Sequence, residues 1–570
     1  MFFSFERVLD GADRIAALRR PTIGFRAGRP IGLEPNRGRS GPIRLAAPHR
    51  TALVSIRRRT LGTAGWAALA GAVSGALFVA VADVVALVVA RDASPLIAVG
   101  SFVVDIVPRW AKELAIELFG SNDKLFLIST VGVAALAAAA VAGILELWRR
   151  WAGVALFAAA GLAAIAATVT RADASPVAFL PPAIGALTGA ASVHLLVGAL
   201  RRWREARERT DAAVPIDRRR FLLLTGAGAA AAVLAGVGSR IGSAATSSIA
   251  AVRAALRLPA PASRVQVPAG ADLRLPDLSP LFTPNAHFYR VDTALTVPAI
   301  DPSAWRLTVD GLVEHRVELG FHDLLALGLD EYAITLTCVS NQVGGDLVGN
   351  ARWLGVPVRE VLARARPRTG ADMVLSRSID GFTASTPLSA LTDPGRDAIL
   401  AVGMNGEPLP LEHGFPVRMV VPGLYGYVSA TKWLTELKVT TFAADQAYWT
   451  PRGYSPRAPI KLSSRIDTPR IDRPLAAGPT TIAGVAWAQT VGIAKVEVQV
   501  DGGAWQEAVL AAAINADTWV QWSLDWNATA GSHTLAVRAT DRDGRLQEER
   551  RTPIAPNGST GWQSTLVRVG

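Results

Sequence analysis

Five long apolar stretches before residue 245 limit the folds open to this chain more than any other feature. Most of them reach the ~20 residues that a helix needs to cross a bilayer. They are rich in Ala, Gly, Val and Leu, and small residues let helices pack closely in lipid. The sequence therefore predicts a transmembrane region of about five helices over residues 61–241. The stretches are Leu61–Ala90, Leu125–Leu147, Trp151–Thr170, Val177–Leu200 and Phe221–Val237.

The net charge of +12 on its own suggests nucleic-acid binding, but the basic residues are concentrated beside the apolar stretches. Residues 1–60 carry 13 Arg, no Lys and 4 acidic residues, and residues 201–220 carry 8 Arg and 4 acidic residues. Cytoplasmic segments of membrane proteins show this excess. We therefore expect no nucleic-acid partner, a basic cytoplasmic segment over residues 1–60, and a multi-pass protein of the cell membrane in contact with lipid.

The fifth stretch opens with three arginines, Arg218 to Arg220, followed by Phe221 and Leu222. This run resembles a twin-arginine export signal, whose pathway carries proteins already folded around a cofactor. A plain membrane anchor with basic flanks would give the same residues. Both interpretations place the chain after about Gly242 outside the cytoplasm.

Two features of the membrane region have more than one interpretation. His194, inside the fourth stretch, could bind haem or relay protons. None of the other six histidines lies in an apolar stretch to act as a second haem ligand, which favours a structural role. In the connector before Lys124, Trp110, Leu114 and Leu118 recur every four residues. They fit an amphipathic helix on the membrane surface or an ordinary packed helix equally well.

Beyond the membrane region the composition changes twice. Residues 242–276 are rich in Ala, Pro and Arg and predict a linker. Residues 277–462 combine short β-rich runs with many Gly and Pro turns, which indicates an α+β domain. One run, YAITLTC, predicts a strand ending at Cys338. Residues 463–570 hold short alternating strands between turn signals and predict an immunoglobulin-like β-sandwich without a disulfide.

Cys338 is the only cysteine, so the chain has no intramolecular disulfide, CxxC zinc site or cysteine-ligated iron–sulfur cluster. A glycine-rich loop follows it, and His413, Arg418 and Lys432 lie downstream near glycine-bearing turns suited to a phosphate. From the residues alone three interpretations stay open. The thiol could bind a soft-ligand metal carried by a phosphorylated organic cofactor, act as a nucleophile beside His413, or be a buried structural group.

Two motifs add a family resemblance. The run from LTCVSNQ to GDLVGNARWLGVPVREVL and the run GFPVRMVVPGLYGYVSATKWL resemble the cysteine loop and the second signature of the sulfite oxidase family of molybdopterin-dependent oxidoreductases. The last segment, with GVAWA and VQVDGGAWQEA, is similar to that family's dimerisation domain. The expected architecture is therefore multi-domain. It comprises an N-terminal α-helical transmembrane bundle, an α+β sulfite-oxidase-type molybdopterin domain, and a C-terminal immunoglobulin-like β-sandwich through which a homodimer is possible.

The resemblance implies a Mo-molybdopterin cofactor and an enzyme that transfers an oxygen atom, with two electrons, to or from a small substrate. Cys338 would be the metal ligand and catalytic residue, alongside two sulfurs from the pterin. The substrate would be sulfite-like, a sulfoxide or an N-oxide, bound on the outer side of the membrane. The cofactor-binding residues that the resemblance implies are Asn285, His287, Tyr289, Ser378, His413, Arg418, Ala430, Thr431 and Lys432.

Two departures from the family's pattern leave the substrate open. Animal and plant sulfite oxidases have Arg-Asn-His in the first cofactor segment, where this chain has Pro-Asn-Ala at residues 284–286. They also have a catalytic Tyr where this chain has Pro451, and Arg452 and Tyr454 are the nearby candidates to replace it. The chain has no cytochrome b5-like or c-type haem segment, so we expect no haem and a separate electron-transfer partner or the quinone pool.

Two other classes of protein compete with the enzyme interpretation. A membrane-anchored binding or adhesion protein could retain the fold without a cofactor, and in it Cys338→Ser would leave function and stability nearly unchanged. A cation-transport component would rest on the helices alone. Those helices hold few intramembrane charges, chiefly Asp83 and Glu146, which disfavours transport.

Overall fold

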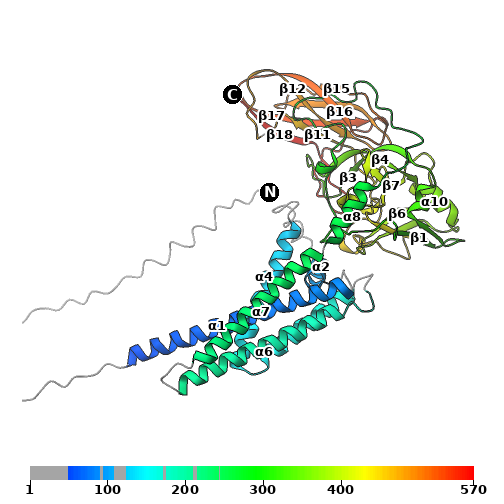
Figure 1. Cartoon of the computed structure of the whole chain (residues 1–570). Coiled ribbons are helices and arrows are strands. Elements are labelled where there is room, and N and C mark those ends of the chain that lie inside the picture. The colour runs from blue at the N-terminus through cyan, green and yellow to red at the C-terminus, as the bar shows by residue number, and fades with distance from the viewer. Residues whose placement is uncertain are drawn as a thin grey trace, which may run out of the picture. The chain divides into compact units, whose positions relative to one another are not determined.

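The computed structural model describes residues 49–89, 94–107, 123–170, 175–209, 215–242, 244–470 and 472–570 (Figure 1). Helices make up the N-terminal part, and β-strands dominate from residue 306 onward, as the sequence predicts. The N-terminal helices are α1 (His49–Val89), α2 (Pro95–Ile106), α4 (Asp123–Trp148), α5 (Ala152–Val169), α6 (Leu180–Arg209), α7 (Pro215–Gly242) and α8 (Ala244–Ala255).

Within the described residues, four helices are long and apolar enough to cross a membrane, which is consistent with membrane anchoring. They coincide with the first four predicted stretches. The fifth predicted stretch lies in α7, but its described apolar part, Phe221–Val233, is shorter than the ~20 residues that a crossing needs. A fifth crossing therefore stays a prediction. The four candidate spans are Gly62–Val89, Phe126–Trp148, Ala152–Val169 and Leu180–Glu205.

Small residues set the packing of the bundle. A side chain on Gly71 of α1 would collide with the carbonyl oxygen of Ala139 on α4, and one on Gly143 of α4 with that of Ala67. The backbones of the two helices therefore approach closely, as small residues permit in lipid. The connector after α1 holds the short apolar helix α2, which was not predicted, while the predicted amphipathic segment around Leu114 lies outside the described residues.

A buried carboxylate joins the end of α4 to the start of α5. Glu146 accepts backbone N–H bonds from Gly153 (2.9 Å) and Trp151 (3.2 Å), which cap α5, and its Oε1 lies 3.0 Å from Nδ1 of His194. The imidazole of His194 also stacks on the indole of Trp151, with 4.3 Å between ring centroids. These contacts give His194 a structural role in the described bundle.

Residues 285–452 contain two five-stranded sheets. In the first the strand order is β2-β1-β10-β5-β6, with β1 and β10 parallel and the other neighbours antiparallel. In the second the order is β3-β4-β7-β8, and β9 also pairs with β7. The strands are β1 (Arg306–Gly311), β2 (Val317–Gly320), β3 (Asp330–Thr337), β4 (Val348–Pro357), β5 (Met373–Ser378), β6 (Thr383–Pro387), β7 (Ile399–Met404), β8 (Glu407–Pro408), β9 (Arg418–Val420) and β10 (Leu434–Thr440). The helices are η3 (Asn285–His287), α9 (Phe321–Leu325), α10 (Val358–Ala365), α11 (Leu388–Thr392), η4 (Leu411–His413), η5 (Gly426–Val428) and η6 (Thr450–Arg452).

The strand predicted to end at Cys338 is confirmed. β3 ends at Thr337, directly before Cys338. α10 buries Val358, Val361 and Leu362 on one face, and this stripe joins the main apolar core of the domain. The strand that presents the cysteine and the helix that follows its loop are therefore both anchored by buried side chains.

Residues 463–569 form two four-stranded antiparallel sheets, ordered β11-β12-β16-β15 and β14-β13-β17-β18. Alternate residues of β17, namely Leu535, Val537 and Ala539, are fully buried in a shared apolar core. This arrangement confirms the predicted immunoglobulin-like β-sandwich. The strands are β11 (Ser463–Thr468), β12 (Gly478–Trp487), β13 (Ile493–Val500), β14 (Gln506–Glu507), β15 (Val509–Leu510), β16 (Val520–Ala528), β17 (Gly531–Asp541) and β18 (Gln563–Val569).

The segment 242–276, expected to be a linker, contains a helix and lies against both domains that follow it. Its helix is α8. Farther along, the N–H of Ala262 donates to the carbonyl of Leu329 (2.7 Å), and the N–H of Leu273 donates to Oε1 of Gln521 in β16 (2.8 Å). From α8 onward the segment is therefore part of the folded unit that carries the cysteine.

Candidate functional site

The cysteine loop, residues 338–347, is closed on itself by hydrogen bonds. The N–H of Cys338 donates to the carbonyl of Leu347 (2.9 Å), and the N–H of Leu347 donates to Oδ1 of the buried Asn341 (2.9 Å). The Cys338 side chain is buried, and its Sγ accepts the N–H of Ser340 (3.4 Å). Burial raises the pKa of the thiol, and the Ser340 N–H partly opposes this. A nearby cation would favour the thiolate instead.

The β-sandwich clamps this loop from outside the α+β domain. The guanidinium of Arg465, in β11, donates to the carbonyl of Gly345 (2.7 Å) and is itself held by Asp467 (2.6 Å). The hydroxyl of Ser559 donates to the carbonyl of Asn341 (2.7 Å). Because Arg465 is buried, its bond to Gly345 is shielded from water. The geometry around the thiol therefore depends on two domains.

A buried arginine at the start of β9 forms the centre of a second cluster. Arg418 donates to the carbonyls of His413 (3.1 Å) and Ala430 (3.4 Å), and its guanidinium lies 5.1 Å from the ring centroid of Trp353. Its Nε is buried and makes no hydrogen bond within the described part of the chain. Burial lowers the pKa of Arg418 to about 10, so it remains a cation at neutral pH. A buried cation with a spare donor is suited to an anionic ligand.

Lys432 adds a second buried cation to this cluster. Its Nζ donates to Oδ2 of Asp292 (2.6 Å) and to the carbonyl of Glu412 (3.1 Å). Burial lowers the pKa of Lys432 to about 8, although Asp292 opposes this shift. Arg290 binds the same carboxylate oxygen (2.9 Å). Asp292 and Arg290 were missed from the sequence, where their position beside the predicted contact Tyr289 was the one available signal.

His413 is neutral at physiological pH and has a defined tautomer. Its Nε2 lies 3.0 Å from the carbonyl oxygen of Asn285, which can only accept, so Nε2 carries the proton. Burial and the neighbouring Arg418 lower the pKa of His413 to about 4. Nδ1 is therefore an acceptor, which suits an N–H donor of a ligand better than a phosphate oxygen.

Gly426 lies close to Tyr289 and to the end of β3, the strand that precedes the cysteine loop. A Cβ placed on Gly426 would lie 3.9 Å from both the carbonyl oxygen of Thr337 and the hydroxyl of Tyr289. Burial raises the pKa of Tyr289, the charge that Cys338 can carry raises it further, and Arg418 lowers it. Tyr289 is therefore within electrostatic range of both Cys338 and Arg418.

The remaining residues predicted to contact the cofactor differ in burial and in hydrogen bonding. Ser378 is buried at the end of β5. Thr431 is also buried, but its hydroxyl lies 2.7 Å from that of Ser376 and so is used in packing against β5. His287 is exposed at the end of η3, and within the described residues no hydrogen bond joins its ring to the other predicted contacts.

The residues proposed to replace the missing tyrosine pack into an aromatic group. Pro451 and Arg452 lie in η6, and the Arg452 guanidinium sits 3.8 Å from the ring centroid of Tyr448. The ring of Tyr454 lies 5.5 Å from that of Tyr427. The tyrosines whose ionisation responds to Cys338 are different ones, Tyr289 and Tyr425, and burial raises the pKa of Tyr425 to about 12.

No group of three or more His, Cys, Asp or Glu side chains in the described residues could hold a metal ion by itself. A metal at Cys338 would therefore take most of its ligands from outside the chain. One buried thiol and two buried cations match the donor set that a phosphorylated dithiolene cofactor requires.

Comparisons with known families match both globular domains. Residues 294–449 match the family described as oxidoreductase molybdopterin binding domain, and residues 463–537 match bacterial Ig domain. Mouse mitochondrial sulfite oxidase is 31% identical over 320 residues, which cover 48% of this chain and 58% of the mouse protein. Chicken sulfite oxidase is 30% identical over 319 residues, which cover 48% of this chain and 69% of the chicken protein.

The chain thus spans little more than half the length of its mammalian relatives. Among solved structures, the sulfane dehydrogenase SoxCD from Paracoccus pantotrophus is 24% identical, with a TM-score of 0.45, covering 50% of this chain and 81% of that one.

Proposed function

Because this chain belongs to the sulfite oxidase family of molybdopterin-dependent oxidoreductases, we propose that it transfers an oxygen atom, with two electrons, to or from a small substrate on the outer side of the membrane. The substrate is sulfite-like, a sulfoxide or an N-oxide. The observation that carries the proposal is that the buried Cys338 and the buried cation Arg418 both act electrostatically on Tyr289, and that Arg418 acts in turn on the buried cation Lys432.

Each part of the site would contribute to the binding of Mo-molybdopterin. Cys338 would supply the chain's one thiolate to the metal. Arg418 and Lys432 would bind the phosphate, with the buried Nε of Arg418 free to donate. His413 would accept an N–H of the pterin through Nδ1. When bound, the cofactor supplies the two-electron oxygen-atom transfer chemistry.

The chain's own residues would orient the substrate and control protons near the thiol. The raised pKa values of Tyr289 and Tyr425 keep both phenols protonated at neutral pH, so each can donate a hydrogen bond to an oxygen of the substrate. Burial of Cys338 excludes bulk water from the reacting region. These roles replace the arginine and tyrosine that the family's pattern places elsewhere.

The proposal extends to topology and partners. The helices anchor the protein in lipid, and the globular domains lie outside the cytoplasm after export through a twin-arginine-type signal. Electrons pass to a separate electron-transfer partner or the quinone pool without a haem in this chain. A homodimer through residues 463–570 completes the proposal.

A cofactor-free binding or adhesion protein is the competing function. It would have to keep Arg418 and Lys432 buried without an anionic ligand, although burying cations is costly unless they are paired. Asp292 pairs with Lys432, whereas Arg418 has only carbonyl partners within the described residues. The enzyme proposal accounts for Arg418, and the adhesion proposal does not.

Analysis of the purified full-length protein tests the proposal. One molybdenum atom and one pterin per chain are expected. A substrate screen with artificial electron carriers then covers sulfite, sulfoxides, N-oxides and nitrate. Protein without molybdenum, and without pterin fluorescence after oxidation, would overturn the proposal. The full chain is the right sample because residues 244–276 pack on the globular domains.

A further inference from the structure

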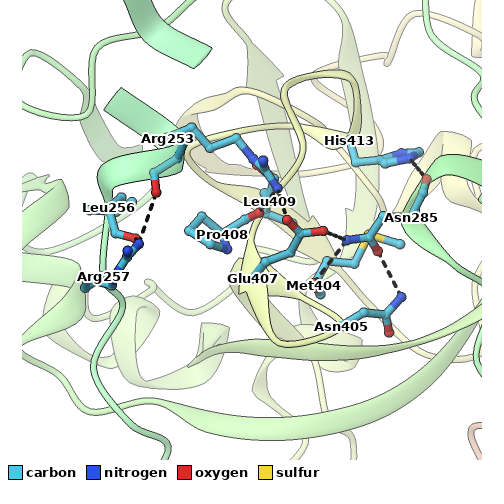
Figure 2. Close-up of polar contacts among 11 residues, drawn as sticks. Arg253, Leu256, Arg257, Asn285, Met404, Asn405, Glu407, Pro408, Leu409 and His413 are labelled. Carbon is cyan, nitrogen blue, oxygen red and sulfur yellow. Dashed lines mark hydrogen bonds and ion pairs between the residues drawn. The ribbon is translucent and has the colours of Figure 1, made fainter. Parts of the chain in front are cut away.

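Arg253 of helix α8, which joins the membrane region to the globular domains, makes polar contacts with the α+β domain. Arg253 donates to the carbonyls of Leu409 (2.7 Å) and Pro408 (2.6 Å) and to Oε2 of Glu407 (2.8 Å) (Figure 2). Two of these acceptors are carbonyls at the β8 end, and the third is a carboxylate. Arg253 therefore holds both the backbone and the side chains of this turn.

Glu407 passes this contact on to the candidate site. Its other oxygen, Oε1, accepts the Nδ2 of Asn285 (2.6 Å), and the carbonyl of Asn285 accepts Nε2 of His413 (3.0 Å) (Figure 2). Hydrogen bonds from Arg253 and Asn285 outweigh the opposing effect of burial and keep the pKa of Glu407 below its ordinary value. Arg253 is therefore connected to His413 through the side chain of Glu407 and then through the side chain and backbone carbonyl of Asn285.

Asn285 has a single orientation in this network. Its Nδ2 donates to Glu407, and its Oδ1 accepts Nδ2 of Asn405 (2.9 Å). A flipped amide would place two donors, or two acceptors, against each other. Hydrogen bonds on both sides of the side-chain amide hold Asn285 in place, and with it the backbone carbonyl of this residue. That backbone carbonyl determines which nitrogen of His413 carries the proton.

The apolar side of α8 contributes independently. Ile249 is buried in the same cluster as Phe288 and Trp353. The ring of Phe288 lies 5.6 Å from that of His413, and Trp353 lies beneath the guanidinium of Arg418. Through these aromatic rings α8 therefore supports both His413 and Arg418, in addition to the polar contact that it makes through Arg253.

We propose that α8 helps to hold the cofactor site in its binding geometry and that Arg253 is a positioning residue. Arg253 holds the orientation of His413 through Glu407 and Asn285. This inference rests on the proposed function. It makes retention of the cofactor depend on the helix that leads out of the membrane region. Arg253 acts through other residues and is not itself assigned a contact with the cofactor.

Arg257 offers a matched control one turn away. It is exposed, it lies two residues beyond the end of α8, and within the described residues its guanidinium donates to the carbonyls of Ala254 (3.0 Å) and Leu256 (3.4 Å) (Figure 2). Arg257→Gln removes the same charge from nearly the same place. It leaves the bonds of Arg253 and Glu407 unchanged, so a general effect of charge on α8 would appear in both variants.

The experiment measures how fast the purified full-length holoenzyme loses molybdenum and pterin during dilution, for wild type, Arg253→Gln, Glu407→Gln, the double variant and Arg257→Gln. We expect Arg253→Gln to lose cofactor about three- to tenfold faster, because charge-assisted bonds are lost but Glu407 is partly screened by solvent. The double variant should lose it no faster than the faster single variant, because both act through one contact. Arg257→Gln should match wild type.

Each outcome decides the inference. Equal loss rates for Arg253→Gln and wild type would overturn it, as would an equal acceleration by Arg257→Gln. Additive effects of Arg253→Gln and Glu407→Gln would show two separate structural roles and reject the chain of contacts. The melting temperature, followed in parallel, should change little in Arg253→Gln. Wild-type protein without molybdenum would instead overturn the proposed function, and this inference with it.

Discussion

The cysteine loop and the basic cluster adjoin each other, but different forces hold them in place. The loop around Cys338 is fixed by backbone hydrogen bonds and by two side chains of the β-sandwich that bond to its carbonyls. The basic cluster is fixed by charged side chains of one domain, with Asp292 as a shared counter-ion. Hydrogen bonds to backbone groups therefore fix the metal side of the site, and ion pairs between side chains contribute to the anion side. Changes to the two sides should have different signatures.

Cys338→Ser should have the largest effect. Serine is close in size, so the fold should persist, but the alcohol is a poor ligand for a soft metal, and activity should fall by more than about 100-fold. Steady-state turnover beside a melting curve checks this. Full activity in a folded Cys338→Ser protein would contradict the assignment of the cysteine loop as the metal side of the site, because Cys338 would then have only a structural role.

Arg418→Met should come next. It removes the buried cation but keeps much of the apolar contact with Trp353. Molybdenum and pterin content should fall by about 10- to 100-fold, since bonds to charged groups contribute about 1.5–3 kcal/mol. Arg364→Met, at an exposed position of α10, is the matched control and should bind cofactor normally. Equal cofactor content in both variants would mean that charge does not hold the anion side.

Arg465→Gln should have an intermediate effect, limited to the cysteine loop. Loss of its bond to Gly345 should let the loop open more often, and alkylation of Cys338 in cofactor-free protein should become about tenfold faster. The lone thiol makes the labelled site unambiguous. Arg470→Gln, which removes an exposed ion pair with Asp472 in the same region, should leave the rate unchanged. A slower or equal rate in Arg465→Gln would show that the sandwich does not clamp the loop.

The pH dependence of cofactor loading should be the smallest effect and should belong to the basic cluster alone. Lys432 must be protonated to attract a phosphate, and with a pKa of about 8 its charged fraction falls by about fourfold between pH 7 and pH 8.5. The rate of loading into cofactor-free protein should fall accordingly. Lys432→Met should load slowly at every pH, without this decline. Because the pKa of His413 is about 4, its charge should not change between pH 6 and pH 8.

The sequence predicted the elements whose cause is local. The run YAITLTC predicted the strand before Cys338. The two motifs also predicted that His413, Arg418, Ala430 and Lys432 belong together, which their contacts support. A short-range sequence pattern is sufficient to predict an element when the burial of one of its faces determines its structure.

What the sequence did not predict depends on contacts between distant segments. Nothing in the local pattern distinguishes Asp292 from other acidic residues, and its importance arises only when Lys432 reaches it across 140 positions. The Ala-rich and Pro-rich composition of residues 242–276 predicted a linker. Its packing on the α+β domain was missed because the partners of Arg253 lie about 155 positions away. The apolar helix α2 was missed because it lies inside a connector between predicted crossings.

The clamp on the cysteine loop has a consequence for the order of events during synthesis. Arg465 and Ser559 follow Cys338 by more than 120 and 220 positions, so a growing chain exposes the thiol long before either contact can form. Domains fold in the order in which the ribosome releases them. The metal ligand therefore reaches its final geometry only once the last strands have formed. Insertion of a cofactor into this site belongs to the finished polypeptide and not to the nascent one.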